Sequence, residues 1–251
     1  MIRSPCKRVT VTSELHFNCG QGGGEQIMSE QETKKTKILF FGDSITDMGR
    51  NRDENADKIW KYGNGYPIFV ASSLYRENPQ KYEVLNRGIG GNRSVDLYTR
   101  IKGDVWNLHP DILSILIGVN DVWHEIDWGN GVGIDRFEKV YGMMIEDTVK
   151  RLPNVKIVLM EPFILKGENT AGKFNEFQNV YAYAKVVKKL AAQYDLFFLP
   201  LQDKFDAAAS KFGAEHYLYD GVHPDVAGAT LIADAWLELY QTKIKETKAV
   251  K

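Results

Sequence analysis

The chain has 251 residues, of which 43% are hydrophobic and 26% are charged. Its 32 basic and 33 acidic side chains leave a formal net charge of −1, which provides no basic field for a nucleic acid. No apolar run approaches the roughly 18 to 20 residues of a membrane-spanning helix. The composition is that of an ordinary globular protein, long enough to fold without disulfides or a structural metal.

The first 27 residues differ in character from the rest of the chain. They hold both cysteines, Cys6 and Cys19, which are too few for a disulfide framework or a four-ligand zinc site. They show no apolar h-region, so they do not resemble a signal peptide, and a cytoplasmic protein is expected. Either Met28 is the natural start and an upstream extension precedes it, or the segment is a genuine disordered arm. We expect residues 1–36 to form a flexible extension.

Five short apolar runs, rich in β-branched and aromatic residues, predict β-strands. Continuous apolar runs of this length are typical of parallel strands that are covered on both faces. The predicted strands are residues 37–41, 82–86, 112–117, 155–160 and 196–201.

Amphipathic stretches lie between and after these strands. Apolar residues at helical spacing predict helices over 134–152, 174–194 and 226–240, and Pro67 fits the first turn of another. Alternation of strands and helices predicts a parallel, doubly wound sheet in one three-layer α/β/α domain over 37–240. The lysine-rich end, 241–251, is expected to be a frayed, charged tail.

Polar residues follow the predicted strands, at the end of an open α/β sheet where functional sites form. The first strand leads into GDSITD (42–47), the second into NRGIGGNRS (86–94), and the third into GVND (118–121). A fourth block, DGVHP (220–224), precedes the last helix. These segments are therefore expected to meet at one edge of the sheet.

Ser44 has the setting of a nucleophile. A serine at a strand end and near a helix N-terminus is exposed to the positive end of the helix dipole. The alternative is a serine that caps the helix, which is a very common use. The string is not the G-x-S-x-G elbow of α/β-hydrolases.

Asp220 and His223 lie three residues apart, close enough for the carboxylate to reach one imidazole nitrogen while the other nitrogen faces the serine. The carboxylate would fix the tautomer, and the imidazole would accept the serine proton. The alternative is an Asp-Gly turn followed by a surface histidine.

Acyl transfer also requires donors that face the developing oxyanion. The Ser44 N–H can supply one, a Gly91 N–H a second because glycine allows a close backbone approach, and the Asn120 amide a third. The alternatives are an ordinary turn glycine and an ordinary turn asparagine.

With these four ordered blocks the sequence resembles the SGNH hydrolases, also called the GDSL esterase/lipase family, over about residues 37–240. The resemblance implies a flavodoxin-like three-layer fold with a five-stranded parallel sheet. It also implies Ser44 as nucleophile, His223 as general base and acid, Asp220 as the orienting carboxylate, and Ser44, Gly91 and Asn120 as the oxyanion hole. Of the adjacent Gly90 and Gly91, the second matches the family position just before a polar residue.

Other charged residues near these blocks have less specific explanations. Asp43 and Asp47 can indicate a metal site or an aspartyl nucleophile, but turn and capping roles are preferred. Asp121 is expected to brace the Asn120 loop. Arg50 and Arg93 can touch a substrate, although solvated or salt-bridged arginines are commoner.

The substrate is indicated only by aromatic residues close to the blocks. Trp60 and Tyr62 follow the first block, while Trp123, His124 and Trp128 follow the third, and aromatic faces with polar neighbours suit sugar rings. The alternative is that all of them are packed loop residues. The string GDSITDMGRN (42–51) also resembles family members that deacetylate carbohydrates.

We therefore expect an O-acetyl esterase that acts on acetylated sugars such as xylan fragments, without a cofactor. Alternatives are a lysophospholipase, short-chain lipase or thioesterase, and, in another class, a non-catalytic glycan-binding module. His109 and His124 lack paired ligands at metal spacing, so no metal is expected. The expected partner is a small-molecule or oligosaccharide ester, with no nucleic acid or membrane. The sequence does not indicate an oligomeric state.

Overall fold

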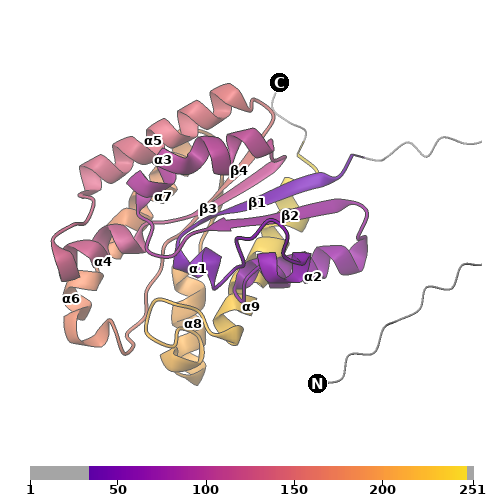
Figure 1. Ribbon diagram of the computed structural model, residues 1–251. Coiled ribbons are helices and arrows are strands. Elements are labelled where there is room, and N and C mark those ends of the chain that lie inside the picture. The colour runs from indigo at the N-terminus through magenta and orange to yellow at the C-terminus, as the bar shows by residue number, and fades with distance from the viewer. Residues whose placement is uncertain (1–33, 248–251) are drawn as a thin grey trace, which may run out of the picture. The chain divides into compact units, whose positions relative to one another are not determined.

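The computed structural model describes residues 34–247, which contain a five-stranded parallel sheet (Figure 1). The strands are β1 (Thr36–Gly42), β2 (Tyr82–Gly88), β3 (Ile112–Leu116), β4 (Lys156–Met160) and β5 (Phe197–Leu199). Their order across the sheet is β2-β1-β3-β4-β5, and every neighbouring pair is parallel. All five predicted strands are confirmed, with ends that differ by one or two residues.

Helices cover both faces of this sheet, as its continuous apolar strands require. On one face α3 (Ser94–Asp104) packs on α5 (Ile134–Arg151), which packs on α7 (Val180–Gln193). The other face carries α2 (Tyr66–Glu77), α8 (Gln202–Phe212) and α9 (Val226–Leu239) (Figure 1). The predicted three-layer α/β/α architecture is confirmed.

Shorter helices occupy the connections. These are α1 (Ser44–Asp47), α4 (Val119–Trp128) and α6 (Phe174–Phe177), together with 3₁₀ turns at Lys58–Lys61, Trp106–Leu108, Ala171–Lys173 and Ala214–His216. Among the helices that the structure describes, none combines the length and the apolar character needed to cross a membrane.

The helices follow the apolar spacing of the sequence, with one interruption. In α5 the residues at i, i+3/i+4 intervals, among them Phe137, Tyr141 and Met144, are fully buried, as predicted. The predicted helix over 174–194 is instead two helices, α6 and α7. The break lies at Gln178 and Asn179, whose N–H groups turn back to Phe174 and Glu176. Apolar residues therefore keep their helical spacing across the break, so the spacing alone cannot show where one helix ends and the next begins.

The C-terminal end differs from the predicted frayed tail. Tyr240–Ile244 forms a turn of π-helix, Ile244 is fully buried, and its carbonyl accepts a hydrogen bond from Lys156 Nζ at 2.7 Å. Burial of this one apolar side chain extends the packed domain past the predicted end at residue 240. The predictions for residues 1–33, including the alternative start at Met28, lie outside the described residues, as does the rest of the tail after 247.

The strand order determines where a site can form. From β1 the chain moves to β2 on one side, and it then returns past β1 to β3 on the other side. Such a reversal leaves a crevice at the carboxyl ends of the strands. Gly42 is level with both Gly88 and Leu116 in the sheet register, so the three segments that follow β1, β2 and β3 start at the same height.

Candidate active site

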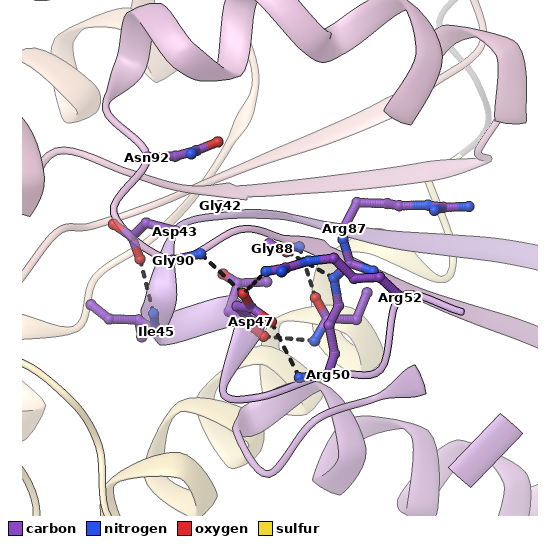
Figure 2. A network of polar contacts seen from close by, with 12 residues as sticks. Gly42, Asp43, Ile45, Asp47, Arg50, Arg52, Arg87, Gly88, Gly90 and Asn92 are labelled. Carbon is purple, nitrogen blue, oxygen red and sulfur yellow. Dashed lines mark hydrogen bonds and ion pairs between the residues drawn. The ribbon is translucent and has the colours of Figure 1, made fainter. Parts of the chain in front are cut away.

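Ser44 begins α1, directly after the carboxyl end of β1, and it is partly exposed. Asp43, not Ser44, caps this helix, because its Oδ1 accepts a hydrogen bond from the Ile45 N–H at 2.9 Å (Figure 2). The predicted capping role of Asp43 is thus confirmed. The Ser44 hydroxyl is not used as a cap and is free for another partner.

That partner is His223, which joins Ser44 to Asp220. Ser44 Oγ lies 2.8 Å from His223 Nε2, and His223 Nδ1 lies 2.7 Å from Asp220 Oδ2. An ionised carboxylate can only accept, so Nδ1 carries the proton and Nε2 remains to accept from the Ser44 hydroxyl. Two segments 179 positions apart in sequence therefore form one continuous chain of hydrogen bonds.

The Asp220 carboxylate is buried but well supplied with donors. It accepts hydrogen bonds from the N–H groups of Val222 at 2.9 Å and His223 at 2.8 Å, and from Asn169 Nδ2 at 3.0 Å. Burial alone would raise its pKa, but the hydrogen bonds from His223 and Val222 outweigh burial and lower the pKa to about 2. Asp220 is therefore ionised at neutral pH.

His223 responds in the opposite direction. Burial disfavours its charged form, but the hydrogen bond and the charge of Asp220 outweigh this and raise the pKa of His223 above its ordinary value of 6.5, with a further contribution from Asp43. The imidazole is thus a stronger base than a free histidine and stabilises a proton taken from Ser44.

Three donors, one from each of the segments that follow β1, β2 and β3, have no acceptor or only one within the described residues. Within residues 34–247, no hydrogen-bond acceptor engages the N–H of Ser44 or the N–H of Gly91, whose φ is +77°. Asn120, the second residue of α4, donates from Nδ2 to the Asn92 carbonyl at 3.1 Å and has a second hydrogen on the same nitrogen. By contrast, the Gly90 N–H is engaged by Asp47 Oδ2 at 3.0 Å, which leaves Gly91 as the glycine with a free donor.

Two further aspartates near the site, Asp43 and Asp121, are fully buried. Burial raises the pKa of Asp43 to about 7, against the hydrogen bond from Ile45. Burial also raises the pKa of Asp121 to about 6, although Ser94 donates to it from its N–H and, at 2.5 Å, from its hydroxyl. Asp121 thereby ties the start of α3 to α4, which confirms its predicted bracing role.

Both arginines that the sequence singled out are held by protein groups. Arg50 Nε donates to the Gly88 carbonyl at 2.8 Å, and burial lowers the pKa of Arg50 to about 10, so it stays charged at neutral pH. Arg93 pairs with Asp96 at 2.9 Å and donates to the Asn130 carbonyl at 2.7 Å. Within the described part of the chain, no group of three or more His, Cys, Asp or Glu side chains could hold a metal ion.

Of the five aromatic residues predicted to touch a substrate, only Trp123 lies against the Ser44–His223–Asp220 chain. Its ring centroid is 5.9 Å from that of His223, and its Nε1 donates to Asp127 at 2.7 Å. Trp123 shares a face of α4 with Asn120, three residues earlier. The third block thus runs directly into a helix, which ends at Trp128.

The other four aromatic residues have different surroundings. His124 packs edge-on against Trp128, and the side chains of Trp128 and Trp60 are well exposed. Tyr62 is buried, and its hydroxyl donates to Tyr75 at 3.1 Å. The ring and hydroxyl of Tyr62 are already used inside the protein, which counts against a substrate contact there.

Sequence reasoning missed Tyr219, which is 52% exposed and lies almost parallel to the His223 ring, with centroids 5.8 Å apart. It also missed Asn169, whose amide donates to Asp220. The position of Tyr219 directly before the fourth block was a usable signal. Asn169 carried none, since it stands 51 residues away from its partner.

Comparisons with known proteins find matches over most of the chain. The model of the GDSL-like lipase/acylhydrolase family matches residues 40–231. An acetylxylan esterase of Geobacillus stearothermophilus is 35% identical over 207 residues, which make up 80% of this chain and 92% of that enzyme. A crystal structure of an acetylxylan esterase from that organism has a TM-score of 0.72 at 33% identity, covering 81% of this chain and 93% of that one.

Two variants of the same esterase, one with a serine and one with an aspartate replaced by alanine, are described as catalytic mutants. The crystal structure of a GDSL-like lipase from Parabacteroides merdae, described as putative, has a TM-score of 0.77 at 38% identity. That match covers 84% of this chain and 98% of the other.

Proposed function

The chain belongs to the GDSL-like lipase/acylhydrolase family, and we propose that this carboxylic-ester hydrolase is a serine esterase that removes acetyl groups from carbohydrates such as acetylated xylo-oligosaccharides. The observation that carries the proposal is the unbroken chain of hydrogen bonds from Ser44 through His223 to Asp220. Ser44 is the nucleophile, His223 the general base and acid, and Asp220 the group that orients the imidazole.

In the first half of the reaction, Ser44 Oγ attacks the ester carbonyl carbon while its proton passes to His223 Nε2. The carbonyl oxygen becomes an anion and is bound by the Ser44 N–H, the Gly91 N–H and the Asn120 amide. His223 then donates its proton to the oxygen of the leaving sugar. The C–O bond breaks, which leaves the acetyl group on Ser44.

In the second half, His223 removes a proton from a water molecule, and the hydroxide oxygen attacks the acetyl carbon. The same three donors bind the oxyanion, and the proton returns from His223 to Ser44 Oγ as acetate leaves. The two halves together consume one ester and one water molecule and release the sugar alcohol and acetate, so the reaction as proposed requires no cofactor. A negative Asp220 stabilises the imidazolium in both halves.

The choice of an acetylated sugar rests on two supports. The first is the similarity to a relative that is named an acetylxylan esterase. The second is the pair of aromatic rings, Trp123 and Tyr219, that lie near His223, the residue that donates its proton to the leaving alcohol. Aromatic faces bind the apolar faces of sugar rings, so this is the side on which a sugar leaving group fits. Action in the cytoplasm stays a prediction.

The test is the release of acetate from acetylated xylo-oligosaccharides by the wild type, by Ser44→Ala and by Ser72→Ala. Ser72 lies on an exposed face of α2 and is the matched control. We expect equal release by the wild type and Ser72→Ala and none above background by Ser44→Ala. Equal activity in all three proteins would end the serine mechanism.

A series of p-nitrophenyl esters from acetate to decanoate separates the acetyl esterase from the lipase and lysophospholipase alternatives. A preference for acetate supports the proposal, and a preference for decanoate counts against it. A protein that binds xylo-oligosaccharides but cleaves none of the esters would instead be the glycan-binding module that the sequence also allows.

A further inference from the structure

The loop after β2 is held on both sides of Gly91. Before it, the Gly88 carbonyl accepts a hydrogen bond from Arg50 Nε at 2.8 Å, and the Gly90 N–H donates to Asp47 Oδ2 at 3.0 Å. After it, the Asn92 carbonyl accepts from Asn120 Nδ2 at 3.1 Å. The Gly91 N–H therefore has no hydrogen-bond acceptor among the described residues, whereas backbone groups on both sides of it form hydrogen bonds.

Asp47 is the acidic residue in this arrangement. It ends α1, three residues after Ser44, and its side chain is 9% exposed. Its carboxylate accepts from the Arg50 N–H at 3.2 Å as well as from Gly90, and it pairs with the guanidinium of Arg52 (Figure 2).

The Gly90 backbone lies close to both the nucleophile and the Asp47 carboxylate. A Cβ atom placed on Gly90 would stand 3.8 Å from Ser44 Cβ and 3.9 Å from Asp47 Oδ2. Gly90 is thus the residue of this loop that neighbours both Ser44 and the Asp47 carboxylate. A side chain at residue 90 would fill the space beside the nucleophile.

We propose that Asp47 is the positioning residue of the oxyanion hole and that Arg52 neutralises its charge. By binding the Gly90 N–H, Asp47 fixes the loop so that the next N–H, that of Gly91, is the one left to bind the oxyanion. Asp47 does not touch the substrate and acts through the loop. The proposal rests on the serine esterase function proposed above, since only that function needs an oxyanion hole.

The charge of Asp47 explains why Arg52 is needed. A carboxylate that binds the N–H next to that of Gly91 repels the negative charge that develops on the carbonyl oxygen in the transition state. The ion pair with Arg52, together with the hydrogen bond from the Arg50 N–H, offsets this repulsion while the tie to Gly90 is kept. The two side chains therefore have separable effects, one on loop geometry and one on charge.

The experiment measures kcat and KM for p-nitrophenyl acetate in a set of variants, with circular dichroism and thermal melting to establish that each is folded. Asp47→Ala removes the acceptor, and kcat is expected to fall by about tenfold to a hundredfold with KM changed less than about twofold. Asp47→Asn keeps an oxygen that can accept from Gly90, and its kcat is expected to stay within about threefold of wild type. The matched control is Asp111→Ala, which removes an aspartate that accepts from a backbone N–H, that of Lys37, at the other end of β1. Its kcat should not change.

A charge test remains informative even if Asp47→Ala does not fold. Arg52→Gln removes the ion-pair partner of the carboxylate, leaving only the weaker influence of Arg50 and Arg100, and is expected to lower kcat about threefold to tenfold. The double variant Asp47→Asn, Arg52→Gln removes the carboxylate as well, and it should recover to within about threefold of wild type. A merely structural ion pair would give no such recovery.

Three results would overturn the inference: a wild-type kcat in folded Asp47→Ala, an effect of Asp47→Ala on KM alone, or a double variant no more active than Arg52→Gln. Ser44→Ala in the same assay separates the two levels of the argument. If Ser44→Ala is active, the proposed esterase mechanism fails. If Ser44→Ala is inactive and the Asp47 variants behave like the wild type, only the positioning role fails.

Discussion

Replacement of Asp220 by asparagine tests the role of the orienting carboxylate, because it changes one atom and keeps the shape of the side chain. In the wild type, Oδ1 accepts from the N–H groups of Val222 and His223, and an asparagine oxygen can keep both bonds. The amide nitrogen then replaces Oδ2, where it faces the donor of Asn169 and donates to His223 Nδ1. The proton of the imidazole moves to Nε2, which can no longer accept from Ser44.

Two magnitudes follow from these contacts. A histidine locked in the wrong tautomer lowers kcat by about 10⁴-fold, or about 5 kcal/mol of transition-state stabilisation. For stability, burial raises the pKa of Asp220, but the donors outweigh burial and bring it from 3.8 to about 2. A depressed pKa contributes stability that is present above pH 3.8 and is lost as pH falls toward 2. The difference is worth about 2 kcal/mol at neutral pH.

The assay is hydrolysis of p-nitrophenyl acetate between pH 6 and 9, beside urea unfolding at pH 7 and at low pH. Asp220→Asn should be nearly inactive at every pH, and its deficit in unfolding free energy should shrink as pH falls toward 2. Asn169→Ala is the matched control, because it removes a donor to Asp220 and leaves the His223 contact intact. Activity of Asp220→Asn within about tenfold of wild type would refute the reasoning.

Other expected outcomes follow from the same structure. Asn120→Ala should lower kcat about a hundredfold, and a loss below about threefold would reject its role as an oxyanion donor. The acid limb of kcat/KM should titrate above pH 6.5, since Asp220 raises the pKa of His223 and only the neutral imidazole is a base; a limb below 6.5 in the free enzyme contradicts this. Tyr219→Ala should raise KM about threefold to tenfold for acetylated xylo-oligosaccharide and leave KM for p-nitrophenyl acetate unchanged, whereas equal effects on both would remove Tyr219 from sugar binding. Trp236→Phe leaves the buried Ser114 hydroxyl without its partner at 2.8 Å and should lower the free energy of unfolding by about 1 to 3 kcal/mol in a denaturant titration.

The sequence was sufficient for the sheet and for the residues at its carboxyl edge. Parallel strands that are buried on both faces are continuous apolar runs. KILFF (37–41) and VKIVLM (155–160) can therefore be recognised as strands from the local sequence alone. Gly42, Gly88 and Leu116 are aligned at the carboxyl ends of three neighbouring strands. Ser44, Gly91 and Asn120, which follow these strands, therefore lie at the same edge of the sheet. The placement of the site follows from topology, not from side-chain detail.

Contacts between distant segments could not be predicted in this way. The turn at 220–224 predicts the Asp220–His223 pair, but nothing local indicates that Asn169 donates to it. Tyr62 illustrates the reverse case, since an aromatic ring in an insertion has the same pattern whether it faces a substrate or packs against Tyr75. The break between α6 and α7 was hidden for a related reason, because apolar residues keep a helical period across it.

The most direct test of the account is identification of the acyl-enzyme. The protein is mixed with acetylated xylo-oligosaccharide, quenched with acid within the first turnovers and digested, and its peptides are mapped by mass spectrometry. The account predicts one acetyl group on Ser44 in the quenched sample, its loss after prolonged incubation, and none in Ser44→Ala. An acetyl group on another residue, or turnover of the same substrate by Ser44→Ala at the wild-type rate, would contradict it.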